Sequence, residues 1–208
     1  MSEDALKAAR ELAAGLDPLA AASRCGAEFE GDSRSGRFSL RLLDDEVMIS
    51  FPGFEFSPDC QLPPHIRALL VHHLAISDGS EPIGDWRAFA DLPNGRFYAR
   101  AFQGYTGDAL VRRLAEKADG LPDAVTSLGG RALTREELPT NADAAWVLPG
   151  LPEVPVAVLW WDSDDEFSAR AELLFDKTAP NHLPTDGSAV LGSWLVGNLI
   201  AGVERRGR

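Results

Sequence analysis

The feature that most constrains the fold is an apolar run of eight residues, from Val154 to Trp161, which is followed by an acidic segment, 162–166. A run so short and so apolar is typical of a strand in the middle of a sheet, where both faces are shielded from water. Successive side chains on a strand point to opposite faces. We therefore expect Trp160 and Trp161 to separate, one packing in the core and the other lining a surface or an interface.

Three further segments have strand character. Apolar and polar residues alternate through 37–57, with Asp44-Asp45-Glu46 at the turn, which predicts a β-hairpin. The segment 144–148 alternates in the same way, and we expect Pro149-Gly150-Leu151-Pro152 to be a loop within the domain. Residues 169–175 fit a strand or a helix, and periodicity does not decide between them.

Helical spacing of apolar residues predicts helices at both ends of the chain and in its middle. Residues 3–25 fit two helices, the second beginning at Asp17-Pro18 and stopped by Gly26. Pro63-Pro64 opens an apolar helix, which we expect to be central. Further helices are predicted to begin at Asp85 (a short helix carrying Trp86 and Phe89), Asp108, Pro122 and Thr185 or Asp186.

The order of these elements predicts the fold class. Helices and strands do not alternate regularly along the chain, which argues against a parallel α/β sheet. We therefore expect residues 1–208 to form a single α+β domain, in which a mostly antiparallel sheet packs against about six helices.

Charge and cysteine content exclude several classes of partner. The 20 Lys and Arg residues stand against 32 Asp and Glu, a net charge of −12, so the chain lacks the basic surplus that nucleic acids and anionic membranes require. Cys25 and Cys60 lie far apart, and no Cys-x-x-Cys or signal peptide is visible. We expect two free thiols and a cytoplasmic location. A small molecule, a protein partner or a second copy of the chain remain open as partners.

Several blocks of the sequence resemble the family called domain of unknown function 3786, found in bacteria and archaea. The resemblance covers most of the chain from about residue 15, and it implies no established activity. Some relatives carry an added four-cysteine iron–sulfur domain of the corrinoid-protein type, which implies a link to corrinoid or redox metabolism, and this sequence lacks that domain. The blocks that carry the resemblance are Leu69–Leu74, Gly84–Phe89, Leu92–Tyr98 with Ala101-Phe102, Pro152–Val156, Trp160–Phe167, Leu174–Asp176 and His182–Asp186.

The histidines are the first candidates for a site. His65, His72 and His73 fall on one predicted helix, and His182 lies far downstream. On a regular helix His65 and His72 are two turns apart, roughly 10.5 Å, and His72 and His73 point about 100° apart. One helix therefore cannot supply two ligands to one metal. A site that combines one helix histidine with His182 is geometrically open, but we predict no metal site. His72 fits either a buried histidine bonded to a carbonyl or carboxylate, or a ligand-contacting residue near His182.

An aromatic group and a polar loop supply the other candidates. Trp86, Tyr98 and their aromatic neighbours fit a core cluster or a platform for a planar ligand. The loop 176–186 ends at a predicted helix N-terminus, where Asp176 and His182 fit an acid–base pair and Thr185 and Asp186 fit caps. The acidic run 162–166 fits a solvated turn, its repulsion relieved by Arg170, better than a cation site.

Three functions follow from these candidates. The first is binding of a small molecule or an unidentified cofactor at His72, Trp86, Tyr98, Asp176 and His182. The second is an enzyme that uses a His/Asp pair for proton transfer, which requires two titratable groups within hydrogen-bond reach in one pocket. The third is a protein-interaction module, which requires an exposed apolar patch.

Overall fold

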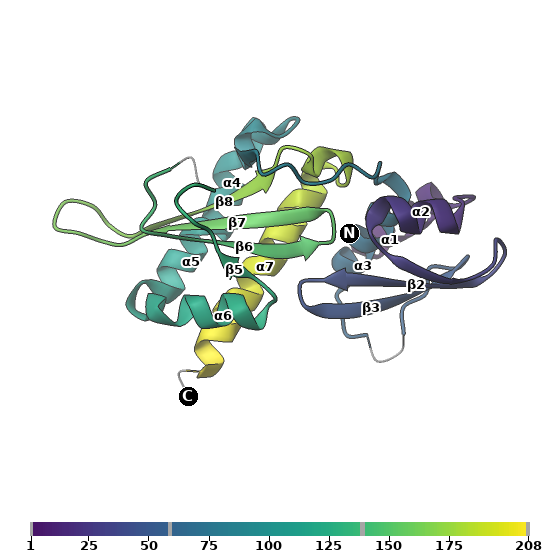
Figure 1. The fold of residues 1–208 in the computed structure, drawn as a ribbon, viewed down its shortest axis with the longest axis horizontal. Helices are drawn as coiled ribbons and strands as arrows, with labels where there is room; N and C mark the ends of the chain where they lie inside the picture. The colour runs from purple at the N-terminus through teal and green to yellow at the C-terminus, as the bar shows by residue number, and fades with distance from the viewer. Residues whose placement is uncertain (1, 58–59, 138–139, 207–208) are drawn as a thin grey trace.

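The computed structural model describes residues 2–57, 60–137 and 140–206, and it confirms the predicted α+β class (Figure 1). The described strands form two antiparallel sheets, a three-stranded one with the order β1-β2-β3 and a five-stranded one with the order β4-β8-β7-β6-β5. One buried cluster contains core residues of both sheets. No described helix is both long and apolar enough to cross a membrane.

The small sheet packs with the first three helices. Its strands are β1 (Glu28–Gly31), β2 (Gly36–Leu42) and β3 (Asp45–Phe51), and β2 and β3 form the predicted hairpin. The helices are α1 (Ser2–Ala13), α2 (Pro18–Cys25) and α3 (Pro64–Ile76). The side chain of Asp17 caps α2 by accepting hydrogen bonds from two backbone N–H groups, and Gly26 ends the helix in a left-handed conformation with φ of 66°. Cys25 and Cys60 are free, as expected.

The apolar run forms strand β7 (Val154–Trp161), which is the middle strand of the large sheet, as predicted. Trp160 is buried in the main core, and Trp161 lies on the opposite face beside a smaller cluster, so the two rings separate. The other strands are β4 (Trp86–Ala88), β5 (Arg131–Ala132), β6 (Ala144–Leu151) and β8 (Arg170–Asp176). The ambiguous segment 169–175 is therefore a strand, for the most part β8.

The remaining helices lie in the chain between β4 and β5 or after β8. They are α4 (Ala99–Tyr105), α5 (Gly107–Leu114), α6 (Leu121–Ser127) and α7 (Thr185–Arg206), together with the 3-10 helices η1 (Phe89–Asp91), η2 (Gly95–Phe97), η3 (Ala115–Gly120) and η4 (Ala179–Asn181). Helix α7, yellow in Figure 1, runs across the large sheet, and its Leu191, Leu195 and Leu199 are fully buried in the main core. Residues at its N-terminal end line the clefts described below.

Three local predictions are wrong. The helix predicted at Asp85 is strand β4, because Trp86–Ala88 form the edge of the large sheet beside β8. The loop predicted at Pro149–Pro152 is largely strand, since β6 continues to Leu151 through a register shift that accommodates Pro149. Arg170 does not face the exposed acidic turn; it pairs with Glu172 and stacks over the ring of Trp161 at 4.5 Å.

A pair of glycines tests how tightly α5 packs on the large sheet. A Cβ at Gly107 would lie 2.1 Å from the backbone oxygen of Ala171 on β8, whereas a Cβ at Gly104 in α4 would meet nothing within 4 Å. We expect Gly107→Ala to lower the free energy of unfolding by about 1–3 kcal/mol and Gly104→Ala to raise it by about 0.4–1 kcal/mol. Urea denaturation measures both, and equal stability of the two variants would contradict this packing.

Candidate functional site

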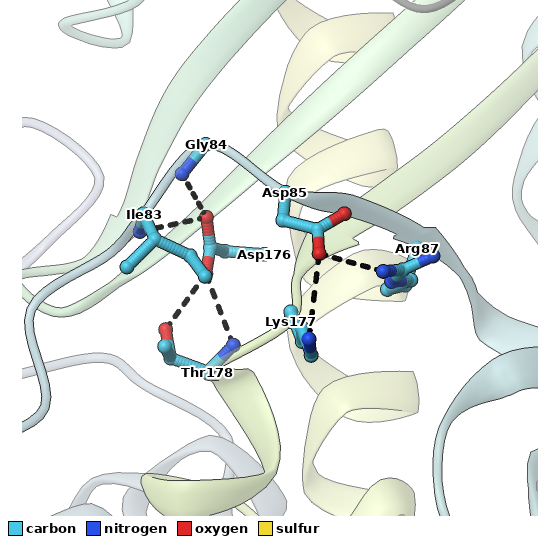
Figure 2. A network of polar contacts seen from close by, with 7 residues as sticks. All are labelled: Ile83, Gly84, Asp85, Arg87, Asp176, Lys177 and Thr178. Carbon is cyan, nitrogen blue, oxygen red and sulfur yellow. Dashed lines mark hydrogen bonds and ion pairs between the residues drawn. The ribbon is translucent and has the colours of Figure 1, made fainter.

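The carboxylate of Asp176 is fully buried at the end of β8, and Figure 2 shows that it binds the chain around it. Its Oδ2 atom accepts hydrogen bonds from the backbone N–H groups of Ile83 at 3.1 Å and Gly84 at 2.6 Å. Its Oδ1 atom accepts from the N–H group of Thr178 at 3.0 Å and from its hydroxyl at 2.8 Å. Oδ2 thus fixes one end of residues 77–85, the segment between α3 and β4, which we call the connecting loop, and Oδ1 fixes Thr178 just after β8.

A second carboxylate in the same network has a different environment. Asp85 is partly exposed and pairs with Arg87 at 2.6 Å and with Lys177 at 3.6 Å (Figure 2). Exposed ion pairs of this kind contribute little, since solvent screens them. The two carboxylates can therefore be compared, because Asp176 is buried and Asp85 is in contact with solvent.

We expect Asp176→Ala to lower the free energy of unfolding by roughly 2–4 kcal/mol, because the N–H groups of Ile83, Gly84 and Thr178 lose their acceptor. Asp85→Ala, the control, should cost less than about 1 kcal/mol. Chemical denaturation of both variants measures the difference. Similar losses in the two variants would show that the buried carboxylate does not hold the connecting loop.

His182 and His73 form a second buried network beside the connecting loop. His182 places Nδ1 2.6 Å from the hydroxyl of Ser77 and Nε2 2.8 Å from the carbonyl oxygen of Ser80. His73 places Nε2 3.2 Å from the carbonyl oxygen of Cys25 and Nδ1 3.4 Å from that of His182. Both rings are fully buried and Ser77 is only 2% exposed, so this serine–histidine contact has no access to a substrate.

Burial sets the charge states in the second network. Desolvation lowers the pKa of His73 from 6.5 to about 4, so this ring is neutral at neutral pH. Desolvation also raises the pKa of the Cys25 thiol to about 11, so the cysteine is protonated and a poor nucleophile. Neither residue suits nucleophilic catalysis in this setting.

The shifted pKa of His73 predicts an acid-dependent loss of stability. Between about pH 6.5 and pH 4 the unfolded chain binds a proton at this residue and the folded protein does not, so stability falls as the pH falls. A shift of this size corresponds to about 3 kcal/mol. Between about pH 6.5 and pH 4, we expect the free energy of unfolding of His73→Gln to fall by about 3 kcal/mol less than that of the unsubstituted protein. His65→Gln, an exposed control on the same helix, should retain the full dependence, and a His73→Gln variant that also retains it would contradict the assignment.

A cleft of about 720 Å³ lies between the segment around α4 and the start of α7. Two tyrosines stand in its wall, Tyr98 with 64% and Tyr105 with 42% of its surface exposed. Phe89 forms part of the wall and stacks on the buried Phe102, with ring centroids 4.1 Å apart. We call this the aromatic cleft; its lining residues are Phe89, Pro93, Asn94, Tyr98, Ala101, Tyr105, Pro180, Leu183, Pro184, Thr185, Asp186 and Ala189.

The two walls of the aromatic cleft are tied together. The hydroxyl of Thr185 on α7 donates a hydrogen bond to the carbonyl oxygen of Pro93 at 2.6 Å, across 92 residues of sequence. Desolvation raises the pKa of Tyr105, which keeps its phenol neutral and available as a hydrogen-bond donor. The cleft is therefore a braced, mostly apolar surface with a few polar groups, which is the usual character of a small-molecule site.

His72 lies elsewhere, in a smaller cleft of about 300 Å³ between α1, α3 and the start of α7. His65 also lines this smaller cleft, as does Asp186, which the two clefts share. Among the described residues no group of three or more His, Cys, Asp or Glu side chains is placed to hold a metal ion. The lining of the smaller cleft consists of Ala5, Ala8, His65, Ala68, Leu69, His72, Pro184, Asp186, Gly187 and Val190.

The five site residues predicted from the sequence thus do not converge on one site. Tyr98 lines the aromatic cleft and His72 the smaller one, while Asp176 and His182 lie in the buried networks. Trp86 is half-buried on β4, as the register partner of Asp176. Asn94 and Pro184 in the cleft were not predicted from the sequence, and His72 rather than His73 was expected to be the buried histidine.

The burial of His73 could have been predicted from its position in the helical repeat. His73 lies three and four residues after Leu70 and Leu69, and seven after Ile66, so it falls on their buried face. His72 is one position out of that phase and is half-buried. Asn94 and Pro184 carry no comparable periodic pattern, because they lie outside the regular helices, whereas Tyr98, Ala101 and Tyr105 recur at the helical spacing of α4.

Comparison with known proteins identifies a family. A family model described as a domain of unknown function, DUF3786, matches residues 17–198 of the chain. No curated protein and no solved structure matches the chain.

Proposed function

Because the chain belongs to the DUF3786 family, whose description names no activity, we propose its function from the geometry: it binds a small molecule in the aromatic cleft. The observation that carries the proposal is the cleft itself, about 720 Å³ in volume with Tyr98 and Tyr105 exposed in its wall. Small-molecule sites have volumes of roughly 300–1,000 Å³ and combine apolar walls with a few polar groups.

The charges around the aromatic cleft indicate which class of ligand it would bind. The described lining contains no Lys or Arg, and Asp186 is its one charged side chain. The faces of tyrosine rings attract cations, and the whole chain carries a net charge of −12. Asp186 also stands in the first turn of α7, where it offsets the helix dipole. A ligand with a planar apolar part and a positive charge fits this surface better than an anion does.

A corrinoid or iron–sulfur group fits the aromatic cleft poorly. None of the described lining residues is a histidine, cysteine or methionine, so the cleft offers no imidazole or sulfur ligand. We therefore place no metal-centred cofactor there.

The two alternative functions have less support. The enzyme hypothesis relies on Asp176 and His182, which are fully buried and bonded to the connecting loop. The interaction hypothesis is favoured by one observation, the 84% exposure of Phe97 next to the cleft. A protein partner seated on that ring would cover Tyr98 as well.

The ligand class is testable with three probes of similar shape, which are benzyltrimethylammonium, benzyl alcohol and benzoate. We expect the cation to shift the backbone NMR signals of Tyr98, Tyr105 and Asp186 at lower concentration than the other two. Tyr98→Ala should weaken binding of the cation about fivefold, the equivalent of about 1 kcal/mol for a lost ring contact.

Phe167→Ala provides the matched control, since Phe167 is an exposed aromatic residue, 69% accessible, directly after the acidic turn and outside the cleft. This variant should bind the cation as the unsubstituted protein does. Shifts outside the cleft, or stronger binding of benzoate than of the cation, would contradict the proposal.

A further inference from the structure

The hydroxyl of Ser77 contacts two groups at once inside the buried histidine network. It lies 2.9 Å from the carbonyl oxygen of Arg24 at the end of α2 and 2.6 Å from Nδ1 of His182. On the other side of the ring, Nε2 lies 2.8 Å from the carbonyl oxygen of Ser80. These three contacts join α2, the connecting loop and the segment that precedes α7.

Counting protons shows what these contacts require. A carbonyl oxygen only accepts, so Nε2 of His182 donates to Ser80 and the Ser77 hydroxyl donates its single proton to Arg24. Nδ1 must then carry a proton of its own to form a hydrogen bond with the Ser77 oxygen. All three contacts are hydrogen bonds at the same time only when His182 carries two protons.

A neutral His182 leaves one contact unmade. Its single proton serves Ser80, and the Ser77 hydroxyl then bonds either to Nδ1 or to Arg24 but not to both. A buried polar group that loses its partner is costly, so the hydrogen bonding of Ser77 differs between the two protonation states of His182.

Full burial of the His182 ring opposes a charge on it, and the surrounding groups divide for and against one. Hydrogen bonds from Ser80 lower the pKa of Asp78, and the charge of His182 lowers it further, so this carboxylate favours the charged ring. The guanidinium of Arg24, which donates to the backbone oxygen of Ser77 at 2.9 Å, opposes it. The ring of His73, 5.9 Å away between centroids, is neutral, as is the buried thiol of Cys25.

The same segment forms one wall of the aromatic cleft. Pro180, Leu183 and Pro184, on either side of His182, line the cleft. The connecting loop holds this wall through two further bonds, from the side chain of Asn181 to the hydroxyl of Ser80 at 2.9 Å and from the N–H group of Asp78 to the carbonyl oxygen of Asn181 at 3.3 Å.

We propose that the second proton on His182 is a latch, which fastens the end of α2 and the connecting loop to this wall and so sets the position of residues 180–184. The effect on binding rests on the proposed function: a ligand in the cleft senses the latch through Leu183 and Pro184. Reciprocity then requires that a ligand which prefers the latched wall also favours the second proton.

Long-range ¹H–¹⁵N NMR spectra of protein labelled with ¹⁵N-histidine count the protons on each ring as the pH is varied. We expect His182 to pass from two protons to one while the protein stays folded, and the backbone amides of Leu183 and Thr185 to shift with the same midpoint. Ser77→Ala should lower that midpoint by about one pH unit, because the charged ring loses an acceptor. Ser23→Ala, an exposed control on α2, should leave it unchanged.

Two results overturn the latch. One is a His182 ring that keeps the same number of protons at every pH at which the protein is folded. The other is a ring that titrates while Leu183 and Thr185 do not respond. Failure of benzyltrimethylammonium to bind on both sides of the midpoint, with these amides responding, supports the latch and contradicts the proposed function, so the two failures are distinguishable.

Discussion

The burial of two polar side chains, Asp176 and His182, is the constraint on which the rest of the site depends. A buried carboxylate or imidazole is tolerated only when its polar atoms are hydrogen-bonded. Asp176 finds its partners at one end of the connecting loop and His182 at the other. Satisfying both therefore fixes the path of the chain from α3 to β4 and ties that path to the segment between β8 and α7.

This arrangement explains why the aromatic cleft has a defined shape. One wall belongs to the fixed segment between β8 and α7, because Leu183 and Pro184 come immediately after His182. The other wall rests on the stack of Phe89 on Phe102 and is joined to α7 by the hydrogen bond from Thr185 to Pro93. A site braced on both sides keeps its geometry without a ligand, which lowers the entropy cost of binding. The buried polar residues thus act on the shape of the cleft through their position, and in the proposed function the exposed tyrosines would supply the contact surface.

Much of the fold is predictable from the sequence, and the site only in part, for identifiable physical reasons. Strand β7 and the capped helix α2 are local features, visible as an apolar run and as Asp17-Pro18 with Gly26. The helix predicted at Trp86 is wrong because the pairing of β4 with β8 joins residues about 90 positions apart. Local propensity does not detect such a pairing. The aromatic cleft likewise combines segments that are far apart in the sequence, 89–105 and 180–189, and that meet only in three dimensions. Tyr98 was identified by its residue type, whereas Asn94 and Pro184 carry no chemical signature of their own.

Hydrogen–deuterium exchange tests the central claim, that ligands occupy the aromatic cleft, most directly. The purified protein is compared with and without the low-molecular-weight fraction of an extract from its own source cells. The account predicts slower exchange in peptides that cover 93–105 and 183–189, on the two walls of the cleft, with little change in the hairpin of β2 and β3. Protection confined to the α1–α3 side of the molecule, or no protection of either wall, would contradict it.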